Sequence, residues 1–225
     1  MDSAALYRLL TWFSPSFPVG AYSYSHGLEF AVAEGLVEDR ESLTGWIRAL
    51  LMHGSGLVDG ALFSAAWRAA SVGDIAALRN VAEFASAFRG TGELALESTA
   101  QGEAFSVMAQ AIGKVPMLSQ LAKDQRGVAY PVVVGVACVA GGIPLDAGLA
   151  AYLHAFAANL ISAGVRLIPL GQVDGQRGIL ALEPYVLSSF KRALETSLDA
   201  LGTATPMVEW ASMKHETQHT RLFRS

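Results

Sequence analysis

Two long uncharged runs constrain the fold of this 225-residue chain most strongly. They cover residues 127–145 and 147–165, and only Asp146 separates them. Each run is long enough to form a membrane-spanning helix. Both are rich in Ala and Gly rather than in Leu, Ile and Phe, and the second also contains His154 and Asn159, so their transfer into lipid would be poor. We therefore expect a buried helix pair in a soluble protein, with a membrane hairpin as the alternative.

Apolar residues recur at helical spacing along most of the chain. In the second run, Leu149, Leu153, Phe156 and Leu160 lie three or four residues apart and fall on one face of a helix. No segment alternates apolar and polar residues over the length of a strand between hairpin turns. The sequence therefore predicts an all-α fold: a single-domain bundle of about eight to ten helices, in which 147–165 is a central, buried, Ala-rich helix.

The C-terminal part of the chain has helix signals of its own. Asp174 is expected to cap a short helix, and Pro184 is expected to begin a separate one. Residues 202–206 then form a linker-like stretch of Gly, Thr, Ala and Pro. These signals divide the chain into an all-helical domain, 1–201, and a linker with a partner-binding C-terminal tail, 202–225.

The composition indicates a protein that works with a partner. Apolar residues make up 52% of the chain and charged residues only 16%, which leaves little charge to cover the surface of a monomer. The net charge of −4 and the absence of a Lys/Arg run argue against nucleic-acid binding. The one cysteine, Cys138, lies in an apolar run, which suits a buried thiol in a reducing compartment. We expect the protein to be cytoplasmic, because its N-terminus also lacks the basic region of a secretory signal.

Residues 14–29, SPSFPVGAYSYSHGLE, combine loop residues with the apolar side chains of a core. Two prolines fix the backbone, and Gly20 permits angles that other residues resist. The segment carries no charge before its His and Glu, but it includes Phe17 and Tyr22, which a solvated linker would not need. It is either a tight connection pinned into its own core or a docking surface, since well-shaped loops often carry function.

Near the C-terminus, His215, Glu216 and His219 match the H-E-x-x-H pattern of zinc proteases. A catalytic zinc needs a third protein ligand, and residues 220–225 contain no His, Asp or Glu. We therefore expect these polar residues to lie on an exposed tail helix without metal. A zinc hydrolase that uses this motif remains the competing hypothesis.

Other enzyme signatures are absent from the sequence. There is no G-x-x-x-x-G-K-[ST] loop for a nucleotide and no G-x-S-x-G motif for a nucleophilic serine. Glu93, Glu97 and Glu103 share one predicted helix, but a charged helix face is usually solvated. The chain is therefore not predicted to be an enzyme, and no cofactor is expected.

Four separated segments resemble the UreF family of urease accessory proteins. They are 14–29, given above, 151–162 (AYLHAFAANLIS), 163–177 (AGVRLIPLGQVDGQR) and 212–225 (SMKHETQHTRLFRS). Their order and spacing span nearly the whole chain. One departure is His219, where this family more often has an aromatic residue.

This resemblance implies an all-helical scaffold without catalysis of its own. Such a scaffold pairs with a UreD/UreH-type accessory protein, recruits the UreG-type GTPase and helps to deliver nickel to apo-urease, and it is dimeric within that complex. On this basis we expect Tyr22 and His26 to be exposed and to face the GTPase. Asp174, Gln176 and Arg166 would form a polar junction. The expected partner-binding residues are Tyr22, Ser25, His26, Glu29, Arg166, Asp174, Gln176, Lys214, His215 and Arg221.

The tail combines apolar residues with Lys214 and Arg221, inside an acidic protein. Such a segment is suited to become ordered on binding, when its cations pair with carboxylates of a partner. We expect it to dock into the UreD/UreH-type partner, with Arg221 as its principal polar contact. The alternative is that the tail folds back on its own helices.

Overall fold

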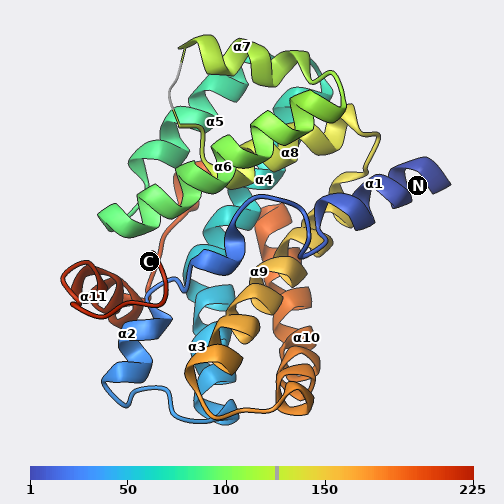
Figure 1. The fold of residues 1–225 in the computed structure, drawn as a ribbon. Helices are drawn as coiled ribbons and strands as arrows, with labels where there is room; N and C mark the ends of the chain where they lie inside the picture. The colour runs from blue at the N-terminus through green and yellow to red at the C-terminus, as the bar shows by residue number, and fades with distance from the viewer. Residues whose placement is uncertain (125–126) are drawn as a thin grey trace.

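A computed structural model describes residues 1–124 and 127–225, and within these residues every regular element is a helix (Figure 1). The predicted all-α fold is therefore confirmed. The elements are α1 (Ser3–Trp12), η1 (Ala21–Ser23), α2 (Leu28–Ala33), α3 (Arg40–His53), α4 (Ser55–Ser71), α5 (Ile75–Ala87), α6 (Gly92–Ile112), α7 (Pro116–Asp124), α8 (Tyr130–Ala140), α9 (Leu145–Leu167), α10 (Gln172–Glu195), η2 (Leu198–Ala200) and α11 (Pro206–His215).

Several helices begin where a polar side chain caps them. Asp2, Asp74 and Thr91 each accept a hydrogen bond from a backbone N–H in the first turn of the helix that follows. At α3, Asp39 accepts from the N–H of Ser42 while the Ser42 hydroxyl receives the N–H of Asp39, which makes a reciprocal capping box. These local signals set the helix boundaries before any packing is considered.

The core draws residues from most of the helices, and within it α4 and α8 pack against each other closely. A Cβ atom at Gly135 of α8 would lie only 2.7 Å from the carbonyl oxygen of Phe63 of α4, so the absence of a side chain permits this approach. Cys138 on α8 is fully buried, as expected. Burial raises the pKa of the Cys138 thiol well above its ordinary value, so Cys138 is an unreactive core residue.

The two uncharged runs form α8 and α9. Helix α9 contacts α10, α3, α4, α2 and α8, which confirms its predicted central place (Figure 1). By length and composition alone, α9 and the continuous stretch Arg40–Ser71 could each span a membrane. Half of the apolar window in α9 and 72% of that in Arg40–Ser71 is buried inside the fold, as is usual for core helices of a soluble protein.

One helix prediction is wrong in the C-terminal half. Pro184 does not begin a helix, because α10 runs without interruption from Gln172 to Glu195 with this proline inside it. Pro184 lies on the exposed side of α10, where water can satisfy the carbonyl that its missing N–H leaves free. Asp174 is consequently in the first turn of α10 rather than its cap, and Gly171 holds the cap position.

The C-terminal tail folds back on the rest of the chain. Helix α11 packs against α2 and α6, and the C-terminus lies beside the 14–29 loop (Figure 1). Val208 and Phe223 are each 3% exposed, so the tail contributes to the hydrophobic core. The tail therefore adopts the second of the two arrangements considered for it, packed on its own helices, and is not an arm exposed to solvent.

Candidate functional site

The 14–29 loop is pinned from one side and open on the other. Phe17 is buried, and its ring lies 5.1 Å from that of Phe105 on α6, while Pro18 is exposed. Gly20 adopts φ 74°, a left-handed conformation that glycine reaches without strain. Tyr22 is 70% exposed, as predicted. The loop therefore presents one aromatic side chain from a fixed backbone.

The prediction that His26 is exposed is wrong, because only 4% of this residue is accessible. Its ring is held by polar groups on two helices. Nε2 lies 2.7 Å from the Ser55 hydroxyl at the start of α4, and Nδ1 lies 3.3 Å from both carboxylate oxygens of Glu97 on α6. His26 also has φ 58°, which is uncommon for a residue with a side chain.

A second buried histidine, His215, joins the tail to the loop. Its Nδ1 lies 2.8 Å from Glu93 of α6, and its Nε2 lies 3.0 Å from Glu29 of α2. Glu29 is 7% exposed and also accepts hydrogen bonds from the backbone N–H groups of Leu222 at 2.6 Å and Phe223 at 2.9 Å. One carboxylate therefore holds both the end of α11 and the residues that follow it.

The H-E-x-x-H motif does not form the face of one helix. Helix α11 ends at His215, which is fully buried, whereas His219 lies in the exposed segment beyond it. The expectation of an exposed tail helix is therefore wrong for His215. Both of its ring nitrogens face carboxylates, and among the described residues no group of three or more His, Cys, Asp or Glu side chains is placed to hold a metal ion.

The last residues of the tail bind the loop and α6. Ser25 binds the Ser225 carbonyl oxygen through both its backbone N–H and its hydroxyl, and Arg224 donates its N–H to the Ser23 carbonyl at 2.8 Å. The Ser225 hydroxyl donates to Glu97 at 2.6 Å. Residues from both ends of the chain thus form one structural unit, which we call the loop–tail unit: residues 14–29, the start of α6 and residues 212–225.

The glutamates of α6 are not a solvated face, contrary to the expectation. Glu93 is 7% exposed and binds Arg221 at 3.0 Å in addition to His215, while Glu103 alone is exposed. Burial by itself would raise the pKa of the Glu97 carboxyl. The nearby His26 and the hydroxyl of the tail's last serine outweigh that effect and hold this pKa below its usual value, so the carboxylate is ionised.

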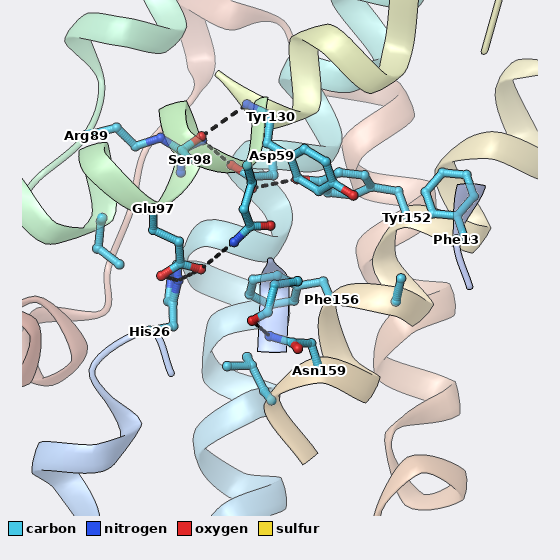
Figure 2. Close-up of a pocket in the computed structure, with 15 residues that line it drawn as sticks. Phe13, His26, Asp59, Arg89, Glu97, Ser98, Tyr130, Tyr152, Phe156 and Asn159 are labelled. Atoms are coloured by element: carbon cyan, nitrogen blue, oxygen red, sulfur yellow. Dashed lines mark hydrogen bonds and ion pairs between the residues drawn. The ribbon is translucent and has the colours of Figure 1, made fainter. Parts of the chain in front are cut away.

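A mainly apolar cavity of about 70 Å³ that also contains a cluster of polar side chains lies beside this unit (Figure 2). Asp59 of α4 accepts hydrogen bonds from Arg89 at 2.7 Å and from the Tyr152 hydroxyl at 2.9 Å. The side chain of Arg89 is 7% exposed, and within residues 1–124 and 127–225 its Nε has no hydrogen-bond partner. Burial raises the pKa of Tyr152 well above its ordinary value. This cluster was not predicted from the sequence, although a single Asp within the apolar helix 55–71 is a signal that could have indicated it.

The other predicted site residues are spread over the surface. Arg166 stacks over the ring of Phe223 at 4.3 Å, which brings it to the loop–tail unit. Asp174 instead pairs with Arg40 at 3.3 Å, and Gln176 is exposed on α10. Lys214 is exposed on α11. The structure therefore gathers most of the predicted residues in the loop–tail unit. The prediction that Arg166, Asp174 and Gln176 form one polar junction is wrong, because Arg166 lies against Phe223 while Asp174 pairs with arginines.

Comparison with known proteins gives a consistent result. The UreF family model matches residues 37–183. The chain is 51% identical over 225 residues to the urease accessory protein UreF of Rhodopseudomonas palustris (strain BisB5), an alignment that covers 100% of this chain and 93% of that protein. It is 50% identical to the proteins of the same name from Bradyrhizobium sp. (strain BTAi1) and Granulibacter bethesdensis, with at least 99% of this chain and 94% of each of those proteins covered.

Proposed function

We propose a function from the premise that this chain belongs to the UreF family of urease accessory proteins. It is a urease maturation factor that acts as a scaffold in the cytoplasm. It pairs with a UreD/UreH-type protein, recruits and regulates the UreG-type GTPase, and helps to deliver nickel to apo-urease. This role requires the assembly of other proteins and no catalysis by the chain itself.

The observation that carries this proposal is the joining of the two ends of the chain into the loop–tail unit. Tyr22 is 70% exposed and Leu222 is 64% exposed, although the segments that hold them are anchored by buried residues. Partial burial lowers the pKa of the Arg166 guanidinium, and Tyr22 is close enough to oppose that shift. Rigid, exposed aromatic and arginine side chains are the residue types most enriched at the centres of protein interfaces.

We assign the GTPase contact to Tyr22 and the UreD/UreH-type contact to the tail, through Arg221 and its neighbours. Arg221 is 38% exposed at its side chain while it binds Glu93, so part of the guanidinium remains accessible to a partner carboxylate. Because the tail is already packed on its own chain, it can bind as a preformed surface, which reduces the entropy lost on association.

The homodimer expected within the accessory complex needs a further apolar surface. Leu10 on α1 is 65% exposed, and Leu180 on α10 is 69% exposed. A self-association surface on either helix would cover side chains of this kind, which supports the dimer as part of the proposal.

A pull-down separates this function from a merely structural loop. Purified wild-type chain and the Tyr22→Ala variant are each incubated with the UreD/UreH-type protein and the UreG-type GTPase. Tyr22→Ala should keep the helical spectrum and lose the GTPase. Val72→Ala is the control, because Val72 is also an exposed apolar residue, at 79%, but lies at the end of α4, away from the loop and from the helices considered for the dimer. Recovery of the GTPase in equal amounts by wild type and Tyr22→Ala would refute the assignment.

A further inference from the structure

Three residues that are far apart in the sequence form a hydrogen-bonded chain: Ser55, His26 and Glu97. Ser55 is the first residue of α4, His26 lies in the 14–29 loop, and Glu97 is on α6. The Ser55 hydroxyl lies 2.7 Å from His26 Nε2, and His26 Nδ1 lies 3.3 Å from each oxygen of the Glu97 carboxylate. Figure 2 shows the His26 ring directed at Glu97.

The hydrogen-bonding capacities assign a role to each atom. The ionised Glu97 carboxylate can only accept, so His26 Nδ1 carries the proton and donates it. In the neutral ring, Nε2 then has a lone pair and accepts from the Ser55 hydroxyl. A serine that donates to a histidine, which is itself oriented by a carboxylate, is the arrangement of a base-activated nucleophile.

The surroundings of Ser55 supply space and a hydrogen-bond donor. Ser55 is partly exposed and lines a cavity of about 30 Å³ together with Arg89. Arg89 Nε is buried and has no hydrogen-bond partner among the residues that the structure describes, which is costly unless a ligand or water uses it. No side chain caps the start of α4, so its first backbone N–H groups also lack a side-chain acceptor near the Ser55 hydroxyl. Such donors stabilise negative charge that develops on an acyl oxygen.

The backbone supports the same interpretation. His26 has φ 58°, a conformation that costs free energy for a residue with a side chain and that clusters at functional sites. The neighbouring contacts of Glu97 with Ser225 and Gln101 fix the carboxylate independently of His26.

We propose that Ser55, His26 and Glu97 form a nucleophilic site that accepts small acyl groups from activated esters. Ser55 Oγ forms a bond to the acyl carbon while His26 Nε2 takes the hydroxyl proton. The ester C–O bond breaks, and His26 returns the proton to the leaving oxygen. Water then attacks the acyl-serine with His26 as base, which releases the carboxylic acid and restores Ser55.

Ser55 and His26 are the catalytic residues of this site, and Glu97 is a positioning residue. This activity lies beyond the scaffold function, and it neither requires nor excludes the assembly of the urease accessory proteins.

The test uses the purified full-length chain and p-nitrophenyl acetate. The wild-type protein should release p-nitrophenolate and carry one acetyl group on the peptide that contains Ser55, as detected by mass spectrometry. Ser55→Ala should abolish this acetylation, whereas Ser71→Ala, an exposed serine at the other end of α4, should not. His26→Asn, which tolerates the left-handed conformation, should lower the acylation rate at least about 100-fold.

Variants of Glu97, and cysteine variants at positions 55 and 71, keep the test decisive. Glu97→Gln should slow acylation and Glu97→Asp should restore part of the rate, with both rates measured on protein whose helical spectrum matches that of wild type. If Ser55→Ala fails to fold, the thiol of S55C should react with iodoacetamide faster than the thiol of S71C, while the buried Cys138 provides little background. Equal acetylation of wild type and Ser55→Ala, or equal alkylation of S55C and S71C, would overturn the proposal.

Discussion

Removal of the Glu29 carboxylate should release the C-terminal tail from the loop–tail unit. This side chain accepts three hydrogen bonds, from His215 Nε2 and from the backbone N–H groups of Leu222 and Phe223. The variant Glu29→Ala leaves all three donors without this acceptor. We expect the tail to open locally while the helical bundle remains folded, because the other helices keep their own contacts.

The free-energy cost of Glu29→Ala depends on which of the three donors water can reach. His215 and Phe223 are buried, whereas Leu222 is 64% exposed, so water can replace the carboxylate only for Leu222. A buried donor left unpaired costs about 1–3 kcal/mol, so the two buried donors together cost about 2–6 kcal/mol. The lower value corresponds to about 30-fold weaker protection of the tail amides. Glu29→Gln keeps one acceptor oxygen and should cost about half as much.

Hydrogen exchange monitored by mass spectrometry or NMR measures this effect at the amides of Phe223 and Arg224. Both amides are hydrogen-bonded within the loop–tail unit, to Glu29 and to the Ser23 carbonyl respectively. Glu34→Gln is the matched control, because Glu34 is an exposed carboxylate at the end of the same helix. Unchanged protection of these amides in Glu29→Ala would show that the carboxylate does not hold the tail.

Four other variants test the packing and the charges, each by urea unfolding. Gly102→Ala should destabilise the fold by at least about 1–3 kcal/mol, because its Cβ would lie 2.1 Å from the carbonyl oxygen of Val128. By contrast, Gly45→Ala meets nothing within 4 Å in the middle of α3 and should stabilise by about 0.5–1 kcal/mol. Asp174→Asn should change stability by less than about 1 kcal/mol, since it breaks only exposed ion pairs. Because the pKa of Glu97 is lower in the folded protein than its unfolded-state value near 4.5, the ionised carboxylate stabilises the fold above that pH. The difference in unfolding free energy between wild type and Glu97→Gln should therefore shrink as the pH falls from about 4.5 through the lower, folded-state pKa. A pH-independent difference would contradict this assignment.

Local patterns in the sequence were sufficient to predict the helices and much of the core. Leu43, Ile47 and Leu50 fall on one face of a predicted helix, and all three are fully buried in α3. Phe17 and Pro18 were both predicted to pin the 14–29 loop; Phe17 packs on α6, whereas Pro18 is exposed. These predictions hold because helical periodicity and the burial of large apolar side chains are properties of residues close together in the sequence. Pro184 is the exception, because packing along α10 outweighs its local tendency to begin a helix.

The partners of the polar residues could not be predicted from such local patterns. His215 belongs to a sequence motif with His219, but α11 ends between them and its actual partners are Glu29 and Glu93, more than a hundred residues away. His26 was expected at the surface because the family resemblance implies a partner contact there, whereas its actual partners, Ser55 and Glu97, are 29 and 71 residues away in the sequence.

The sequence by itself therefore determined the all-α fold, the membership of a family and which segments matter. Only the tertiary structure decided what the polar side chains in those segments do. A buried His or Glu takes its protonation and its role from the groups that packing brings within about 3 Å, since an unpaired polar group is costly in the interior. For Ser55, His26 and Glu97, those groups come from three separate segments, so no local pattern could have identified them.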